Sequence, residues 1–149
     1  MANLPYQNAY DKQAADGLNW ETGDFLVVAV DLDAGGYVFD SLDRFRDELT
    51  GVITSTAVSG MDTAPHPTGG IVGDLIDVTG VGGLLIPTGS RLTALVVCTN
   101  TGVAATDELL FYWDTDPDGN PLSRIGDDTI APVVWSNGYD RVWSITRTP

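Results

Sequence analysis

Residues 25–32 read FLVVAVDL, a continuous apolar run interrupted only by Asp31. Asp24 precedes this run, and Gly35 and Gly36 follow it. A run of this kind is typical of a strand that is buried on both faces. Further short apolar runs separated by turn residues occur at 52–58, 71–78, 84–87, 91–100, 109–114, 132–135 and 141–145. We therefore expect a mainly β fold.

The acidic residues support this expectation. Of the 21 acidic residues 18 are Asp, and the chain also contains 17 Gly. Asp is poor in strand and helix interiors but good in turns and caps, because its short carboxylate bonds nearby backbone N–H groups. The composition therefore indicates short strands joined by many tight turns. Asn137-Gly138 lies between apolar runs and predicts a hairpin turn there.

Two segments have helical rather than strand character. Residues 6–16 (YQNAYDKQAAD) predict a short helix that stops at Gly17. The second prediction is a helix at about 41–49, capped by Asp40 or Ser41 and closed by Gly51. It rests on a helical spacing of four apolar residues: Val38, Leu42, Phe45 and Leu49.

The length of 149 residues suits one domain, with roughly 68–70% of the unfolded surface buried. We expect a single-domain β-sandwich or partly closed barrel over 1–149 with two short helices. Residues 1–20 would form an N-terminal helix or arm. Residues 59–70 (SGMDTAPHPTGG) contain two Pro and three Gly without periodic apolar residues, and they predict a flexible loop. Strand order cannot be read from the sequence, so jelly-roll and immunoglobulin-like topologies both stay open.

The charge of the chain argues against several partners. Its formal net charge is −14 and its pI is about 4.1. The seven cations are scattered, so we expect no nucleic-acid partner. The first residues, MANLPYQNAYDKQ, do not resemble a signal peptide, and the run 25–30 is too short to span a membrane. The lone Cys98 excludes an internal disulfide.

The sequence contains one candidate metal site, which would bind calcium. Asp114, Asp116 and Asp118, followed by Gly119, match the first half of an EF-hand loop. The second half fails, because the twelfth position is Ile125 where a bidentate Glu is needed. A polar hairpin loop between 109–114 and 122–125 explains these residues better. We therefore predict no metal or cofactor, with weak calcium binding at the three Asp residues as the alternative.

Catalytic residues are not predicted either. His66 is the single His and lies between two prolines in the expected loop. Cys98 lies within an apolar run, where a small buried side chain fits. A sugar-stacking platform is conceivable, but aromatic residues in strands more often pack in cores. Its members would be Tyr112, Trp113, Trp135, Tyr139 and Trp143.

Several stretches taken together resemble a family of small structural proteins from tailed bacteriophages. The resemblance begins with an N-terminal helix that ends in Gly17–Trp20. It continues through 24–31 (DFLVVAVD), 37–39 (YVF) leading to Leu49, 95–102 (LVVCTNTG), 108–114 (ELLFYWD) and 133–143 (VVWSNGYDRVW). The loop at 59–70 and the turn at 114–120 have no counterpart in the family pattern.

The resemblance implies a non-catalytic virion component, assembled in the host cytoplasm. We expect a decoration protein on the capsid surface, bound to the major capsid protein or other virion proteins. The resemblance is compatible with a homo-oligomer, for which a trimer is one option. Two alternatives stay open: a tail or head-tail connector component, and a β-sandwich carbohydrate-binding module.

Overall fold

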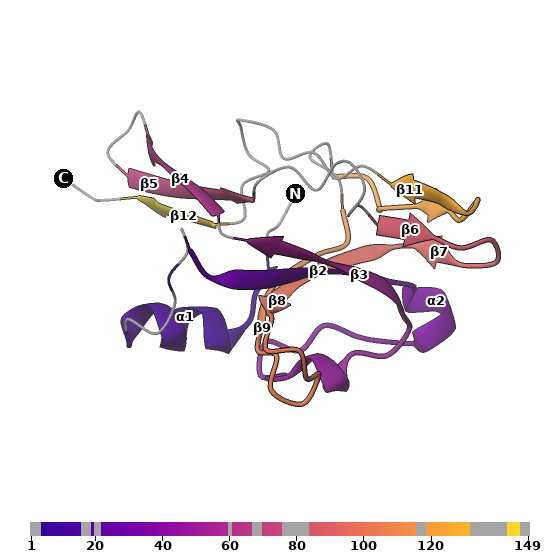
Figure 1. Ribbon diagram of the computed structural model, residues 1–149, viewed down its shortest axis with the longest axis horizontal. Helices are drawn as coiled ribbons and strands as arrows, with labels where there is room; N and C mark the ends of the chain where they lie inside the picture. Colours follow the sequence, from indigo (N-terminus) through magenta and orange to yellow (C-terminus); the bar gives the residue numbers. More distant parts are fainter. Residues whose placement is uncertain are drawn as a thin grey trace.

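The computed structural model of the chain describes residues 4–15, 19, 22–59, 61–66, 70–75, 84–115, 119–131 and 143–146 (Figure 1). The helical elements are α1 (Gln7–Ala14), α2 (Leu32–Gly35) and the 3-10 turn η1 (Arg46–Glu48). The strands are β1 (Leu4–Pro5), β2 (Asp24–Val30), β3 (Val52–Ser59), β4 (Met61–His66), β5 (Gly70–Leu75), β6 (Leu84–Ile86), β7 (Arg91–Leu92), β8 (Ala94–Thr99), β9 (Leu109–Trp113), β10 (Arg124–Ile125), β11 (Thr129–Ala131) and β12 (Trp143–Thr146). The prediction of a mainly β fold is confirmed.

A five-stranded antiparallel sheet forms the centre, in the order β1-β9-β8-β2-β3. Its inner strand β2 is buried on both faces, as the apolar run predicted. Val27 and Ala29 face one core cluster, and Val28 and Val30 face the other. Burying each of the three valines contributes about 1.5–3 kcal/mol. In the described part of the chain this sheet ends at β1 and β3 and does not close into a barrel.

An outer layer covers the first face of this sheet. It consists of two small antiparallel pairs, β6 with β11 and β7 with β10. The side chains of Leu84, Ile86 and Leu92 point into the first core cluster. Figure 1 shows β6, β7 and β11 gathered at one end of the central sheet, near α2. A further sheet, in the order β12-β5-β4, lies at the upper left of the view.

Residues 37–49, which we call the cover segment, lie over the second face. Tyr37, Leu49 and the partly buried Phe39 pack into the second core cluster with Tyr6 and Tyr112. The N-terminal residues also fold back onto the chain. Leu4 of β1 pairs with Tyr112 of β9, and α1 confirms the helix predicted at 6–16. Residues 4–14 of the predicted arm thus belong to the described fold.

The helix predicted at 41–49 is wrong. Only residues 46–48 form a short 3-10 turn, and Phe45 makes an isolated antiparallel bridge with Glu108. The backbone of this region pairs with 107–109: Leu109 N donates to Arg44 O, and Arg46 N donates to Asp107 O, both at 2.9 Å. Val38 and Leu42 are 80% and 71% exposed, so the four apolar residues do not form one buried face.

The second short helix is α2, in a stretch for which the sequence analysis predicted no helix. The side chain of Asp31 accepts a hydrogen bond from Ala34 N at 3.0 Å and caps the start of α2. Gly36 ends the helix with a φ of +66°, which glycine adopts without steric cost. The described residues therefore contain two short α-helices, as predicted, but the second one lies at 32–35 and not at 41–49.

The loop predicted at 59–70 is wrong for residues 59, 61–66 and 70, which lie in strands, while residue 60 lies outside the described residues. Residues 61–66 form β4, which pairs with β5 from Met61↔Leu75 to His66↔Gly70. Within the described strands β4 is an edge strand of its sheet. An edge strand tolerates Pro65, because one side of its backbone needs no hydrogen-bond donor. Residues 67–69 lie outside the described residues, as does the hairpin turn predicted at Asn137-Gly138.

Candidate interaction surfaces

The buried carboxylate of Asp107 fastens the loop before β9 to the cover segment. Its Oδ1 accepts hydrogen bonds from the backbone N and the hydroxyl of Thr101, at 2.6 and 2.7 Å. Its Oδ2 accepts a hydrogen bond from Nε of Arg46 at 2.8 Å. Burial raises the pKa of Asp107, but the hydrogen bonds from Thr101 and Arg46 outweigh it and leave the pKa below its usual value. This carboxylate therefore has a structural role.

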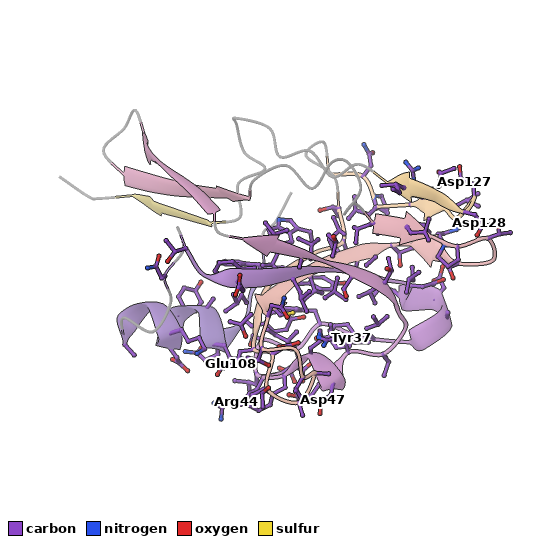
Figure 2. All side chains as sticks on the ribbon, in the orientation of Figure 1. Tyr37, Arg44, Asp47, Glu108, Asp127 and Asp128 are labelled. Atoms are coloured by element: carbon purple, nitrogen blue, oxygen red, sulfur yellow. The ribbon has the colours of Figure 1, made fainter. Side chains whose placement is uncertain are left out.

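A chain of hydroxyl groups fastens the cover segment to the N-terminal residues. The hydroxyls of Tyr6 and Tyr37 lie 3.0 Å apart, and Tyr37 donates to Oδ2 of Asp43 at 2.8 Å. Burial is the main reason why the pKa of each tyrosine is raised, so both phenols stay protonated near neutral pH. Lys12 of α1 also forms an ion pair with Glu108, the residue that bridges to Phe45 of the cover segment. Figure 2 shows Tyr37 and Glu108 on the same side of the central sheet.

Asp31 connects α2 to the outer layer. Besides capping α2 with Oδ1, it accepts a hydrogen bond from the backbone N of Arg91 to Oδ2 at 3.0 Å. Hydrogen bonds from the backbone of Ala34 and Arg91 lower its pKa. Asp31 and Asp107 therefore both bind neighbouring segments of the chain.

The predicted calcium residues are described only in part. Asp114 follows β9, and its Oδ2 accepts a hydrogen bond from the hydroxyl of Tyr112 at 3.3 Å. Thr115 and Pro121 form an isolated antiparallel bridge. Asp116 and Asp118 lie outside the described residues. Within the described ranges, no group of three or more His, Cys, Asp or Glu side chains could hold a metal ion.

The other residues considered as sites take structural positions where they are described. Cys98 is fully buried, and burial is the main cause that raises its pKa to about 12. Tyr112 and Trp113 are buried in the core, so they cannot stack on a sugar. His66 ends β4, and Trp143 begins β12. Trp135 and Tyr139 lie outside the described residues.

Of the seven exposed large aliphatic side chains among the described residues, five belong to two separate surfaces, and the other two are Val52 and Val103. The first surface, the cover face, consists of Val38 and Leu42 on the cover segment. Hydrogen bonds hold this segment: Leu42 N donates to the Asp40 side chain at 2.9 Å, and Gln7 N donates to Ser41 O at 2.8 Å. The aliphatic groups are therefore presented by a fastened loop. Arg44, Asp47 and Glu108 lie on this side of the molecule (Figure 2).

The second surface, the outer face, consists of Leu85, Ile125 and Ile130, which are 49%, 68% and 42% exposed. Leu85 and Ile130 are direct cross-strand partners in β6 and β11, and Ile125 pairs with Arg91 in β10 and β7. Their neighbours Leu84, Ile86 and Leu92 point into the core, so the outer face points away from it. The sequence did not predict this surface, because β6 reads as a uniformly apolar LLI. The alternation of buried and exposed residues in β6 becomes apparent only when its pairing with β11 is known.

A shallow hollow of about 570 Å³ borders the outer face. Asp31 and Asp33 line it from the side of α2, and Ser90, Arg91 and Ile125 line it from the outer layer. Within the described residues, the ion pairs are Lys12–Glu108 and Arg46–Asp107, and the charge of Arg91 helps to lower the pKa of Asp31 without forming such a pair. The hollow therefore combines an aliphatic side chain, a guanidinium group and carboxylates.

Comparison of the chain with protein-family models, with curated proteins and with solved structures gave no match. None of the helices in the described ranges has the length and apolar character needed to cross a membrane.

Proposed function

We propose that this chain is a non-catalytic structural protein of a tailed-bacteriophage virion, a decoration protein that binds the outer surface of the major capsid protein lattice. The observation that carries the proposal is the pair of exposed aliphatic surfaces. The cover face belongs to the layer on one face of the central sheet, and the outer face belongs to the layer on the other. A subunit with contact surfaces on two sides suits an assembly in which it touches more than one neighbour.

The roles of the ionisable side chains support the same proposal. Asp31, Asp43 and Asp107 accept hydrogen bonds that fasten loops, and burial keeps the Cys98 thiol protonated. The net charge of −14 repels packaged DNA and limits non-specific association. The virion itself is inferred from the resemblance of 24–31, 95–102 and 108–114 to small phage structural proteins.

We assign lattice binding to the cover face. Val38 and Leu42 supply aliphatic contacts, and the exposed carboxylates of Asp40 and Asp47 lie on the same segment. Aliphatic groups beside acidic ones fit a partner surface with an apolar depression and Lys or Arg side chains at its rim. The fastened backbone reduces the entropy lost on binding.

Quantitative mass spectrometry of purified particles tests the proposal. We expect the chain in the finished virion, at a copy number comparable with that of the major capsid protein. A Leu42→Asp variant supplied during infection should be incorporated much less than the wild type. The matched control is Tyr10→Asp on α1, which is also exposed and should be incorporated normally. A chain that is abundant in infected cells and missing from particles would refute the proposal, and recovery in the tail fraction would favour the connector or tail alternative.

A further inference from the structure

We infer that the outer face binds a second copy of the same chain, so that two outer faces pack against each other about a two-fold axis. This inference does not depend on the virion proposal. It concerns the chain in solution and follows from three properties of the outer face: its apolar side chains, its rigid backbone and its mixed charge.

The apolar side chains of the outer face form one group. Leu85 and Ile130 are cross-strand partners, which places their side chains next to each other on one face of the β6–β11 pair. Ile125 points away from the same core cluster on the neighbouring β7–β10 pair. Single exposed aliphatic residues are ordinary on protein surfaces, whereas aliphatic residues that share one face offer a common apolar area for a contact. Its burial against a copy would remove all three side chains from water.

The backbone of this face is held rigidly by contacts between its two loops. Asp128 accepts hydrogen bonds from the backbone N and the hydroxyl of Thr88, both at 2.9 Å. Gly126 N donates to Ser90 O at 2.8 Å. The loops approach so closely that a Cβ at Gly126 would lie 1.9 Å from the carbonyl oxygen of Pro87. A surface fixed in this way loses little conformational entropy when it docks.

The charges of the outer face favour a copy of itself as the partner. Arg91 is the exposed cross-strand neighbour of Ile125, and it forms no ion pair within 4 Å with a described carboxylate, although its charge acts on the nearby Asp31. Asp33, Asp127 and Asp128 are exposed at the same end of the molecule, where Figure 2 shows the last two. A two-fold axis brings a patch against itself, so a patch that carries both signs can pair Arg91 of one copy with a carboxylate of the other. A partner of purely basic or purely acidic character would leave one of these signs unmatched.

Hydrogen bonds keep the carboxylates ready for such pairing. Thr129 donates to Asp127 and Thr88 donates to Asp128, and these bonds lower the pKa of both carboxyl groups. Both are therefore ionised at neutral pH. The cover face is a separate surface, because its aliphatic groups lie on the opposite side of the central sheet from the outer face. Its exposed acidic residues are Asp40 and Asp47.

Sedimentation velocity of the purified full chain over a concentration series tests the inference. We expect a species of twice the 15.8 kDa chain mass. The double variant Leu85→Asp/Ile130→Asp should weaken the dimer by at least about tenfold in Kd, because it places four carboxylates in the contact. The matched control Val38→Asp/Leu42→Asp introduces the same chemistry on the opposite layer and should leave the dimer unchanged. Circular dichroism verifies that each variant is folded.

A second variant keeps the test decisive if the double variant does not fold. Arg91→Glu leaves the aliphatic group intact and removes the charge complementarity, so it should also weaken the dimer by about tenfold or more. A wild-type chain that stays monomeric throughout the concentration series overturns the inference. So does a trimer, or a dimer that tolerates both outer-face variants. None of these results bears on the particle test of the proposed function.

Discussion

Arg46 donates from its Nε to Oδ2 of Asp107 across 2.8 Å, in a pair whose carboxylate is fully buried. The two residues are 61 positions apart, and their contact joins η1 to the loop that precedes β9. The same carboxylate accepts two hydrogen bonds from Thr101. One side chain thus positions both the cover segment and this loop against the central sheet.

Replacing this carboxylate should destabilise the fold. We expect Asp107→Asn to lower the free energy of unfolding by about 2–4 kcal/mol, because it leaves the partly buried Arg46 without its counter-charge. Urea unfolding followed by circular dichroism measures the change. The matched control Asp47→Asn removes an exposed carboxylate from the same 3-10 turn and should cost less than about 0.5 kcal/mol. Equal effects of the two variants would contradict the structural role of Asp107.

The same carboxylate should make stability depend on pH. Its pKa is lower in the folded chain than in the unfolded chain, where it is about 3.9. Its contribution is therefore complete above about pH 5 and is lost as the pH falls through the unfolded and then the folded pKa. We expect the stability difference between wild type and Asp107→Asn to shrink as unfolding is measured from about pH 6 down to about pH 3. A difference that stays constant over this range would show that Asp107 acts without its charge.

The thiol of Cys98 should be chemically inert in the folded chain. Burial raises its pKa to about 12, so almost no thiolate exists at neutral pH, and its side chain is inaccessible to solvent. Labelling with iodoacetamide, read out by mass spectrometry, should modify the chain only in concentrated guanidinium chloride. Rapid labelling under native conditions would contradict the position of Cys98 in the second core cluster.

The contact between the two outer-layer loops should tolerate no side chain at Gly126. A Cβ there would meet the carbonyl oxygen of Pro87 at 1.9 Å, and both groups belong to the backbone. We expect Gly126→Ala to cost about 2 kcal/mol or more in thermal or urea unfolding. Gly89→Ala is the comparison: its φ of +94° strains an alanine, but a Cβ there has no neighbour within 4 Å, so the cost should stay near 1 kcal/mol. A larger effect at Gly89 than at Gly126 would contradict the packing of these loops.

The parts of the fold that could be predicted from the sequence are those in which local pattern and burial agree. The run 25–32 is apolar at nearly every position because β2 is covered on both faces. Residues 6–16 contain α1, which needs no distant partner to be recognised. The burial of Cys98 within its apolar run was predicted for the same reason.

The errors arise where pairing between distant residues outweighs local pattern. The spacing of Val38, Leu42, Phe45 and Leu49 fits a helix, but the backbone around Phe45 pairs with residues 107–109. Residues 61–66 have no apolar period, yet they form the edge strand β4 because their backbone pairs with β5, a contact that the local pattern does not reveal. The outer face was missed for a related reason: the exposure of Leu85 depends on β11, which is more than 40 residues away.

Zero-length cross-linking of intact particles tests the central claim most directly. The chain has 21 acidic residues and a single lysine, so carbodiimide coupling would join its carboxylates to lysines of neighbouring proteins. The proposed function predicts links from acids of the cover segment, such as Asp40 and Asp47, to the major capsid protein. Particles that lack the chain, or that link it only to tail proteins, would contradict its assignment as a capsid decoration protein.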